Sequence, residues 1–409
     1  MAKTLLQRSG RLLWDVGILS SLRVVAIIIG LGYVKVYTNR LTPDALGIFF
    51  YLGTLSYLLN ALIFVPFDFY LQAYCARAGE QLPLRHIVKM SAGVLASGLA
   101  LVAILGAILI VFGQLAAIDV LTLYLVAVLL FGCTSLRNLL NNRNHRKVVA
   151  TALVFEAGGR ISAFLVLTAM VTASGRLLFA SAGAALLIEL MGLLYYSSRK
   201  LQWNVDAIPP QSPPLIATTA PVSVSAACNL AQLQSYRTLY PWAGATASAA
   251  IYAVVANVGS AGMAAAGQIF AQILLPKVYQ THGQYARTYI RWALLLTVTV
   301  AVIAWLAAPV LVRFITSPHY AAYARLIVFG VMMEGANIIV GAVTVRSMLQ
   351  NDTRRLMAWN IVGAITAVAG YVIVLYTLPG SPAAIGVPLI FSQIVVLSGL
   401  LAGARRKPS

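Results

Sequence analysis

Acidic side chains are scarce in this 409-residue chain, which has ten Asp and Glu residues against 29 Lys and Arg residues. All charged residues together make up 10% of the sequence, whereas hydrophobic residues make up 60%. Soluble domains usually carry about 25% charged residues, so the composition excludes an ordinary soluble globular protein. Apolar segments near the ~20 residues that cross a bilayer recur along the whole chain. The sequence therefore predicts an all-α polytopic membrane protein.

Cysteine and catalytic motifs are also in short supply. The three cysteines, Cys75, Cys133 and Cys228, lie far apart in apolar or juxtamembrane sequence and predict neither a zinc site nor a disulfide framework. The four histidines fall in expected loops, and the sequence has no HExxH and no GxxxxGK[ST] motif. We therefore expect a transporter rather than an enzyme, with no cofactor and no metal site.

The apolar segments and the polar breaks between them predict twelve transmembrane helices. An even number of spans places both termini on one side of the membrane. The expected spans are 13–38, 45–73, 87–114, 118–140, 148–172, 176–197, 214–240, 246–275, 291–312, 320–345, 356–378 and 383–403.

The cations alternate strictly between the two sides of these spans. One face collects 21 of the 29 Lys and Arg residues, Arg137 among them, and the opposite face collects three. Because short loops rich in Lys and Arg stay inside, both termini are expected in the cytoplasm. Most of the formal net charge of +19 is then an orientation signal and a contact with membrane lipids, so no nucleic-acid partner is expected.

A proline-rich linker at 201–213 divides the chain near its midpoint. It separates an N-terminal six-helix bundle (1–200) from a C-terminal six-helix bundle (214–409). Two halves with equal, even span numbers have the same orientation, as in transporters whose substrate path runs between two bundles.

Five cations remain after the 24 allocated to the two faces and are assigned to the interior of the spans, where an ionisable side chain costs at least about 2.5 to 3.5 kcal/mol. Arg23 and Arg160 lie about 10 and 12 residues into their spans, close to the bilayer midplane. Lys35, Arg237 and Arg325 lie within a turn or two of the periplasmic span ends, where snorkelling to the headgroups is the alternative to a functional role.

Four carboxylates also fall inside the spans, namely Asp68, Glu156, Glu189 and Glu334. Glu156 and Arg160 are spaced by four residues and can form a structural pair along one helix. Alternatively, this pair exchanges partners with an anionic substrate or a proton. Glu189 and Glu334 have no cation at helical spacing, which leaves pairing with another helix or protonation. Because five cations meet four carboxylates, the sequence does not predict a strongly cationic cavity.

Three segments resemble the polysaccharide-transporter branch of the multidrug/oligosaccharidyl-lipid/polysaccharide (MOP) exporter superfamily, the Wzx-type O-antigen flippases. Residues 37–49 (YTNRLTPDALGIF), preceded by Arg11-Leu-Leu, are similar to the family's junction between the first two spans. Residues 251–256 (IYAVVA), continuing to Gln268 and Pro276, and residues 319–327 (HYAAYARLI) are similar to shorter family patterns. The resemblance covers both halves of the chain.

The resemblance implies a MOP/MATE-like pair of bundles that moves an undecaprenyl-pyrophosphate-linked oligosaccharide across the bacterial inner membrane by alternating access. It implies that Arg23, Arg160, Lys35, Arg237 and Arg325 engage the pyrophosphate or acidic sugars, with proton or ion coupling left open. A polysaccharide polymerase and a chain-length regulator are further expected partners of a monomeric protein.

Two other functions remain as alternatives. A cation-coupled drug or organic-cation antiporter of the same superfamily would use the acids Asp68, Glu156, Glu189 and Glu334. A membrane-embedded polysaccharide polymerase or ligase is the other alternative, although the loops are shorter than such enzymes need.

Overall fold

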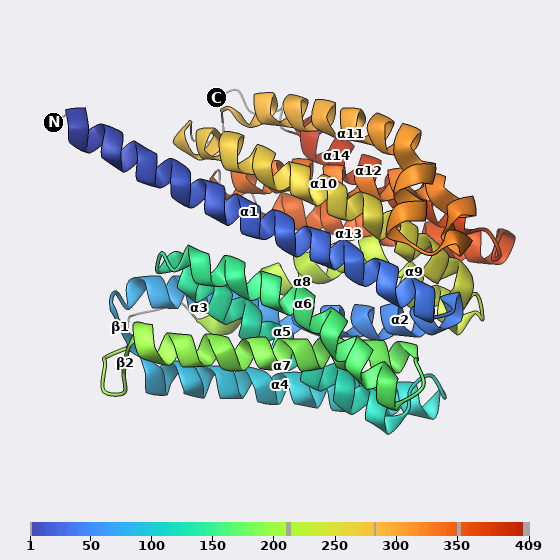
Figure 1. The fold of residues 1–409 in the computed structure, drawn as a ribbon, viewed down its shortest axis with the longest axis horizontal. Helices are drawn as coiled ribbons and strands as arrows, with labels where there is room; N and C mark the ends of the chain where they lie inside the picture. Colours follow the sequence, from blue (N-terminus) through green and yellow to red (C-terminus); the bar gives the residue numbers. More distant parts are fainter. Residues whose placement is uncertain (1, 210–213, 282–283, 350–352, 404–409) are drawn as a thin grey trace. The chain divides into compact units, whose positions relative to one another are not determined.

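The computed structural model describes residues 2–209, 214–281, 284–349 and 353–403, and this part of the chain is almost entirely helical (Figure 1). Eleven helical segments within it are long and apolar enough to cross a membrane. They contain between 20 and 33 residues each, which matches the ~20 residues that span a ~30 Å hydrocarbon core. The chain is therefore an all-α multi-pass membrane protein, as the sequence predicts.

The helices follow one another through short connections. In chain order the α-helices are α1 (Ala2–Arg40), α2 (Pro43–Leu59), α3 (Val65–Arg77), α4 (Leu84–Val111), α5 (Ala117–Asn142), α6 (Arg146–Met170), α7 (Gly175–Lys200), α8 (Leu215–Gln234), α9 (Tyr236–Trp242), α10 (Thr246–Gln280), α11 (Ala286–Ile315), α12 (Ile327–Leu349), α13 (Thr353–Thr377) and α14 (Gly386–Gly403). A π-helical turn η1 (Asn60–Phe64), two 3-10 helices, η2 (Pro318–Leu326) and η3 (Pro382–Ile385), and two short strands, β1 (Gln81–Pro83) and β2 (Gln202–Asn204), complete the elements.

The expected seventh span, 214–240, differs from the other eleven. A turn at Ser235 divides it into α8 and the seven-residue α9, and neither piece is among the eleven candidate spans of the described residues. Pro221 inside α8 and Pro241 inside α9 each remove a backbone donor from the helical ladder. The count of twelve spans consequently stays a prediction.

The second span bends without breaking. It runs through α2, the π-helical turn η1 and α3, and Pro66 occupies the first turn of α3 directly after η1. A proline ring clashes with the carbonyl four residues earlier, and a π-helical turn widens the helix at that point. The irregular part of this span therefore lies at Asn60–Phe64, directly before Pro66.

The chain forms two compact units. Unit 1 comprises residues 1–33 and 63–219, and unit 2 comprises residues 34–62 and 220–409. These units differ from the expected halves 1–200 and 214–409 because the end of α1 and all of α2 group with the second half. In unit 2, α2 packs against α9 and α10, and Gly47 lies so close to Thr246 that a Cβ there would overlap its side chain.

Within unit 1, α5, α6 and α7 lie side by side (Figure 1). Strands β1 and β2 pair in parallel, with Leu82 opposite Trp203. The first residues of the expected linker 201–213 are therefore part of a small sheet, and residues 210–213 lie outside the described part of the chain.

Within unit 2, α10 packs closely against α12. A Cβ at Gly330 would overlap the backbone oxygen of Ala256, and a Cβ at Gly259 would overlap that of Ile327. Small residues let helix backbones approach in this way. Gly259 of α10 and Gly330 of α12 thus serve close helix packing.

Candidate functional site

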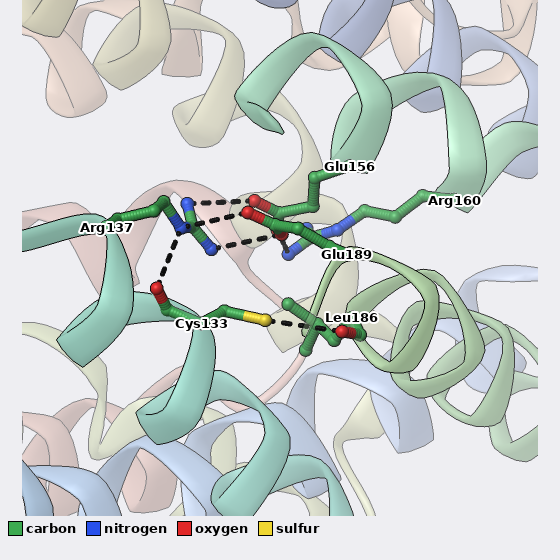
Figure 2. A network of polar contacts seen from close by, with 6 residues as sticks. All are labelled: Cys133, Arg137, Glu156, Arg160, Leu186 and Glu189. Atoms are coloured by element: carbon green, nitrogen blue, oxygen red, sulfur yellow. Dashed lines mark hydrogen bonds and ion pairs between the residues drawn. The ribbon is translucent and has the colours of Figure 1, made fainter. Parts of the chain in front are cut away.

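Four charged side chains form a buried cluster between α5, α6 and α7 of unit 1 (Figure 2). Arg137 of α5 lies at its centre, with Nη1 3.0 Å from Oε2 of Glu156 and Nε 3.1 Å from Oε1 of Glu189. Arg160 Nη2 contacts the other carboxylate oxygen of Glu156 from one turn along α6. Three helices are therefore joined by ion pairs.

The backbone around this cluster supports it. Arg137 Nε also donates to the carbonyl oxygen of Cys133, and the Cys133 thiol donates to the carbonyl oxygen of Leu186 at 3.2 Å (Figure 2). Cys133 is fully buried, as the apolar setting of the three cysteines suggests. These bonds fix α5 against α7 at the height of the ion pairs.

The cluster balances its charges. Two guanidinium groups meet two carboxylates, and the Glu189 side chain keeps only 2% of its surface exposed. Taking ions out of water costs several kcal/mol each, and only close pairing offsets that cost. The intrahelical Glu156–Arg160 pair expected from the spacing is present, but it is part of a larger neutral network.

Sequence reasoning missed Arg137. It was expected among the cations of the cytoplasmic face, whereas its side chain is 13% exposed and paired with two carboxylates. That allocation used only the position of Arg137 along the chain, whereas Arg137 lies inside α5, more than a turn before Asn142, the last residue of the helix. A signal was available, since Glu189 needed a partner from another helix and residue 137 fell within the expected span 118–140.

Arg237 of unit 2 has a different environment. Its Nη2 donates to Oδ1 of Asn257 at 3.0 Å and its Nε donates to the Tyr236 hydroxyl at 2.9 Å. Its guanidinium carbon lies 5.0 Å from the ring centre of Phe50. Among the described residues no carboxylate pairs with Arg237. The half-buried guanidinium is thus held by neutral and aromatic groups and keeps its positive charge.

Lys35 and Arg325, also in unit 2, have contacts that explain them structurally. Lys35 Nζ donates to the carbonyl oxygens of Arg313 and Thr316, where a cation at the C-terminus of α11 is favourable. Arg325 is exposed and stacks over the half-exposed ring of Trp305 at 5.5 Å. Within unit 2 the three expected cations therefore have separate partners.

Arg23 is exposed on α1, beside the exposed side chains of Val24 and Val25. Arg23 is consequently available to solvent, lipid or substrate, and the structure ties it to no particular group in the described part of the chain.

The remaining two acids are held by amides. Asp68 of α3 is buried, and its Oδ2 accepts from Gln72 Nε2 at 2.7 Å and from Asn138 Nδ2 at 2.8 Å. Glu334 of α12 is half-buried and accepts from Asn337 at 3.3 Å. No group of three or more metal-ligating side chains occurs among the residues with described positions.

Sequence comparison gives no match to a protein family and none among curated proteins. Solved structures do match, and the fold they share is that of MOP superfamily transporters. The lipid II flippase MurJ, in an inward closed conformation, aligns with a TM-score of 0.66 and 10% identity over 97% of this chain and 88% of its own.

Two further structures have the same fold. An inward-facing multidrug resistance MATE transporter aligns with a TM-score of 0.59 and 15% identity, covering 95% of this chain and 94% of the transporter. A MOP superfamily transporter from Pyrococcus furiosus, whose binding pocket has reverse polarity, aligns with a TM-score of 0.55 and 13% identity over 96% and 95% of the two chains. The expected MOP/MATE-like fold is confirmed, and the Wzx branch stays a prediction.

Proposed function

We propose that this protein is a transporter that moves a polyprenyl-pyrophosphate-linked oligosaccharide, such as an O-antigen repeat unit, across the bacterial inner membrane. The observation that carries the proposal is Arg237. A guanidinium that keeps its charge inside a membrane protein is costly, and such groups commonly serve substrates. Its planar fork can hold two phosphate oxygens while its neutral partners keep it in place.

The fold supports the same proposal, because one of the similar structures is a lipid II flippase. In the proposed arrangement α8 and α9 together form the seventh of twelve spans, both termini lie in the cytoplasm and the monomer works by alternating access. A polymerase and a chain-length regulator would then act on the delivered unit. Arg23 is a second candidate contact for the pyrophosphate, whereas Arg160, Lys35 and Arg325 are weaker candidates because each has a partner that explains it.

The second candidate function is export of drugs or organic cations, supported by the similarity to a multidrug resistance MATE transporter. Its sites would be acids without a cationic partner, and Asp68 and Glu334 fit that description among the described residues. Glu156 and Glu189 fit it less well because Arg137 pairs with both.

Complementation of a flippase-null bacterial strain tests the proposal, with surface polysaccharide as the readout. Arg237→Gln should abolish complementation at normal protein level, and Arg237→Lys should retain part of it. Arg199→Gln should leave complementation unchanged as the control, because Arg199 is exposed on α7 and is no candidate contact. If Arg237→Gln and Arg237→Lys both complemented as well as the wild type, that result would contradict the role of Arg237. Drug resistance conferred by the wild-type protein without any surface polysaccharide would favour the antiporter.

A further inference from the structure

Unit 1 contains a groove of about 810 Å³ between α6 and α7, with Ile29 of α1 in its wall. We call it the α6–α7 groove. Small residues line part of it, including Gly158 of α6 and Gly192 of α7, and we call this part the floor; Phe155 and Ile188 also line the groove. The last two side chains are 72% and 69% exposed, so large apolar surface faces whatever fills the groove.

The ends of the groove differ chemically. Lys147, exposed in the first turn of α6, lies at one end, and Ser162 lies at the other. The one acidic residue among the described lining residues is Glu189, which Arg137 neutralises. The groove is therefore an apolar channel with an ammonium group at one mouth, which suits a long hydrocarbon chain with an anionic head.

The groove extends over about one leaflet. Lys147 and Ser162 are about 15 residues apart on one helix, or about 22 Å at 1.5 Å per residue. One leaflet of a ~30 Å hydrocarbon core is about 15 Å deep, and Ser162 lies within two residues of Arg160, which is expected near the midplane. A lipid chain that enters beside Lys147 therefore has an apolar path to the middle of the bilayer.

We propose that the α6–α7 groove holds the polyprenyl chain of the lipid-linked substrate, with Lys147 contacting its diphosphate. This inference rests on the proposed function and adds a site for the part of the substrate that stays in the membrane. The small-residue floor widens the groove for a methyl-branched chain. Lys147 lies at the end that the proposed topology places at the cytoplasmic surface, where the substrate would enter.

The glycines of the floor allow a clean test. A Cβ built at Gly158 or at Gly192 has no heavy atom within 4 Å, so Leu at either position can extend into the groove without displacing its walls. Leu also has a higher helix propensity than Gly, by roughly a few tenths of a kcal/mol or more in helix stability. Gly93→Leu in α4 is the matched control, because a Cβ there likewise meets open space and Gly93 lies outside the groove.

The experiment uses the purified full-length protein in lipid nanodiscs and undecaprenyl diphosphate with a photoreactive diazirine in its chain. Labelled peptides are identified by mass spectrometry. We expect labelling of 148–162 and 185–193 in the wild type, reduced about tenfold by Gly158→Leu and Gly192→Leu and unchanged by Gly93→Leu. Lys147→Gln should weaken labelling by the photoreactive diphosphate roughly several-fold. It should leave labelling by a diazirine-bearing polyprenol unchanged, because the polyprenol has no diphosphate.

Two outcomes would overturn the inference. One is labelling of the groove by a diazirine phosphatidylglycerol that undecaprenyl diphosphate does not displace. The other is equal diphosphate labelling in the wild type, Gly158→Leu and Gly93→Leu. Complementation separates this inference from the proposed function. Normal surface polysaccharide with an unlabelled groove would contradict the role of the groove and leave the flippase function standing. A correctly labelled groove without translocation would contradict the flippase function alone.

Discussion

Removal of the Arg137 guanidinium should destabilise unit 1 more than removal of an exposed cation. In Arg137→Met the side chain keeps similar bulk, but Glu189 loses its ion-pair partner while its side chain stays 2% exposed. Glu156 retains Arg160. One buried carboxylate is therefore left unpaired, and breaking a buried pair from one side costs about 3 to 5 kcal/mol.

The double variant Arg137→Met with Glu189→Gln tests the cause. It removes the cation and the stranded negative charge together, so most of the lost stability should return, because replacing both partners of a buried pair is often nearly neutral. Thermal unfolding of the purified full-length protein in one detergent should give the order wild type, double variant, Arg137→Met, from most to least stable. Arg199→Met is the matched control, since Arg199 is exposed on α7 and contacts the exposed ring of Tyr195.

Two results would refute this reasoning. If Arg137→Met unfolded at the same temperature as Arg199→Met, the buried cluster would not hold α5, α6 and α7 together. If the double variant were less stable than Arg137→Met, the cost would not come from an unpaired carboxylate on Glu189. A non-additive return of stability in the double variant is the signature of direct coupling between two residues.

Four further variants test other parts of the structure by the same unfolding measurement. Gly330→Ala should lower the free energy of unfolding by about 1 to 3 kcal/mol, because the added methyl group forces α10 and α12 apart, and an unchanged stability would contradict this close packing. Lys35→Met should cost about 1 to 3 kcal/mol through the lost bonds to the end of α11, whereas Arg325→Met should cost under about 1 kcal/mol; equal effects would argue against the distinction. Asp68→Asn should cost about 1 to 3 kcal/mol because the two hydrogen bonds that the carboxylate oxygen Oδ2 accepts would go to a neutral amide oxygen instead, and an unchanged stability would contradict this.

The helices were predictable because the bilayer imposes a simple rule on composition and length. Even a local boundary could be read from the sequence: Thr42 caps α2 by accepting from the Ala45 amide, and Pro43 occupies the first turn. The seventh span was predicted less well, since hydropathy does not register the turn at Ser235 between α8 and α9. Hydropathy sums over residues, whereas a helix depends on an unbroken ladder of hydrogen bonds.

The number of charged groups inside the spans was predictable from the sequence, but which of them pair with one another was predictable only in part. The pair Glu156 and Arg160 follows from helical spacing, because both residues lie on one helix. The contacts of Arg137 depend instead on how α5, α6 and α7 pack. A count of cations per face treats Arg137 as a surface residue, since position along the chain carries no information about rotation around a helix.

Depth and charge balance rank the cations of the expected spans differently as candidate substrate contacts. By depth, Arg160 is the foremost candidate for the substrate because it lies near the expected midplane. By partners, Arg160 belongs to a neutral cluster, so Glu156 already offsets much of the attraction that its charge would have for an anion. The charge of Arg237 is not offset in this way, since its partners Asn257 and Tyr236 are neutral. An arriving phosphate would therefore gain the full attraction of the Arg237 charge.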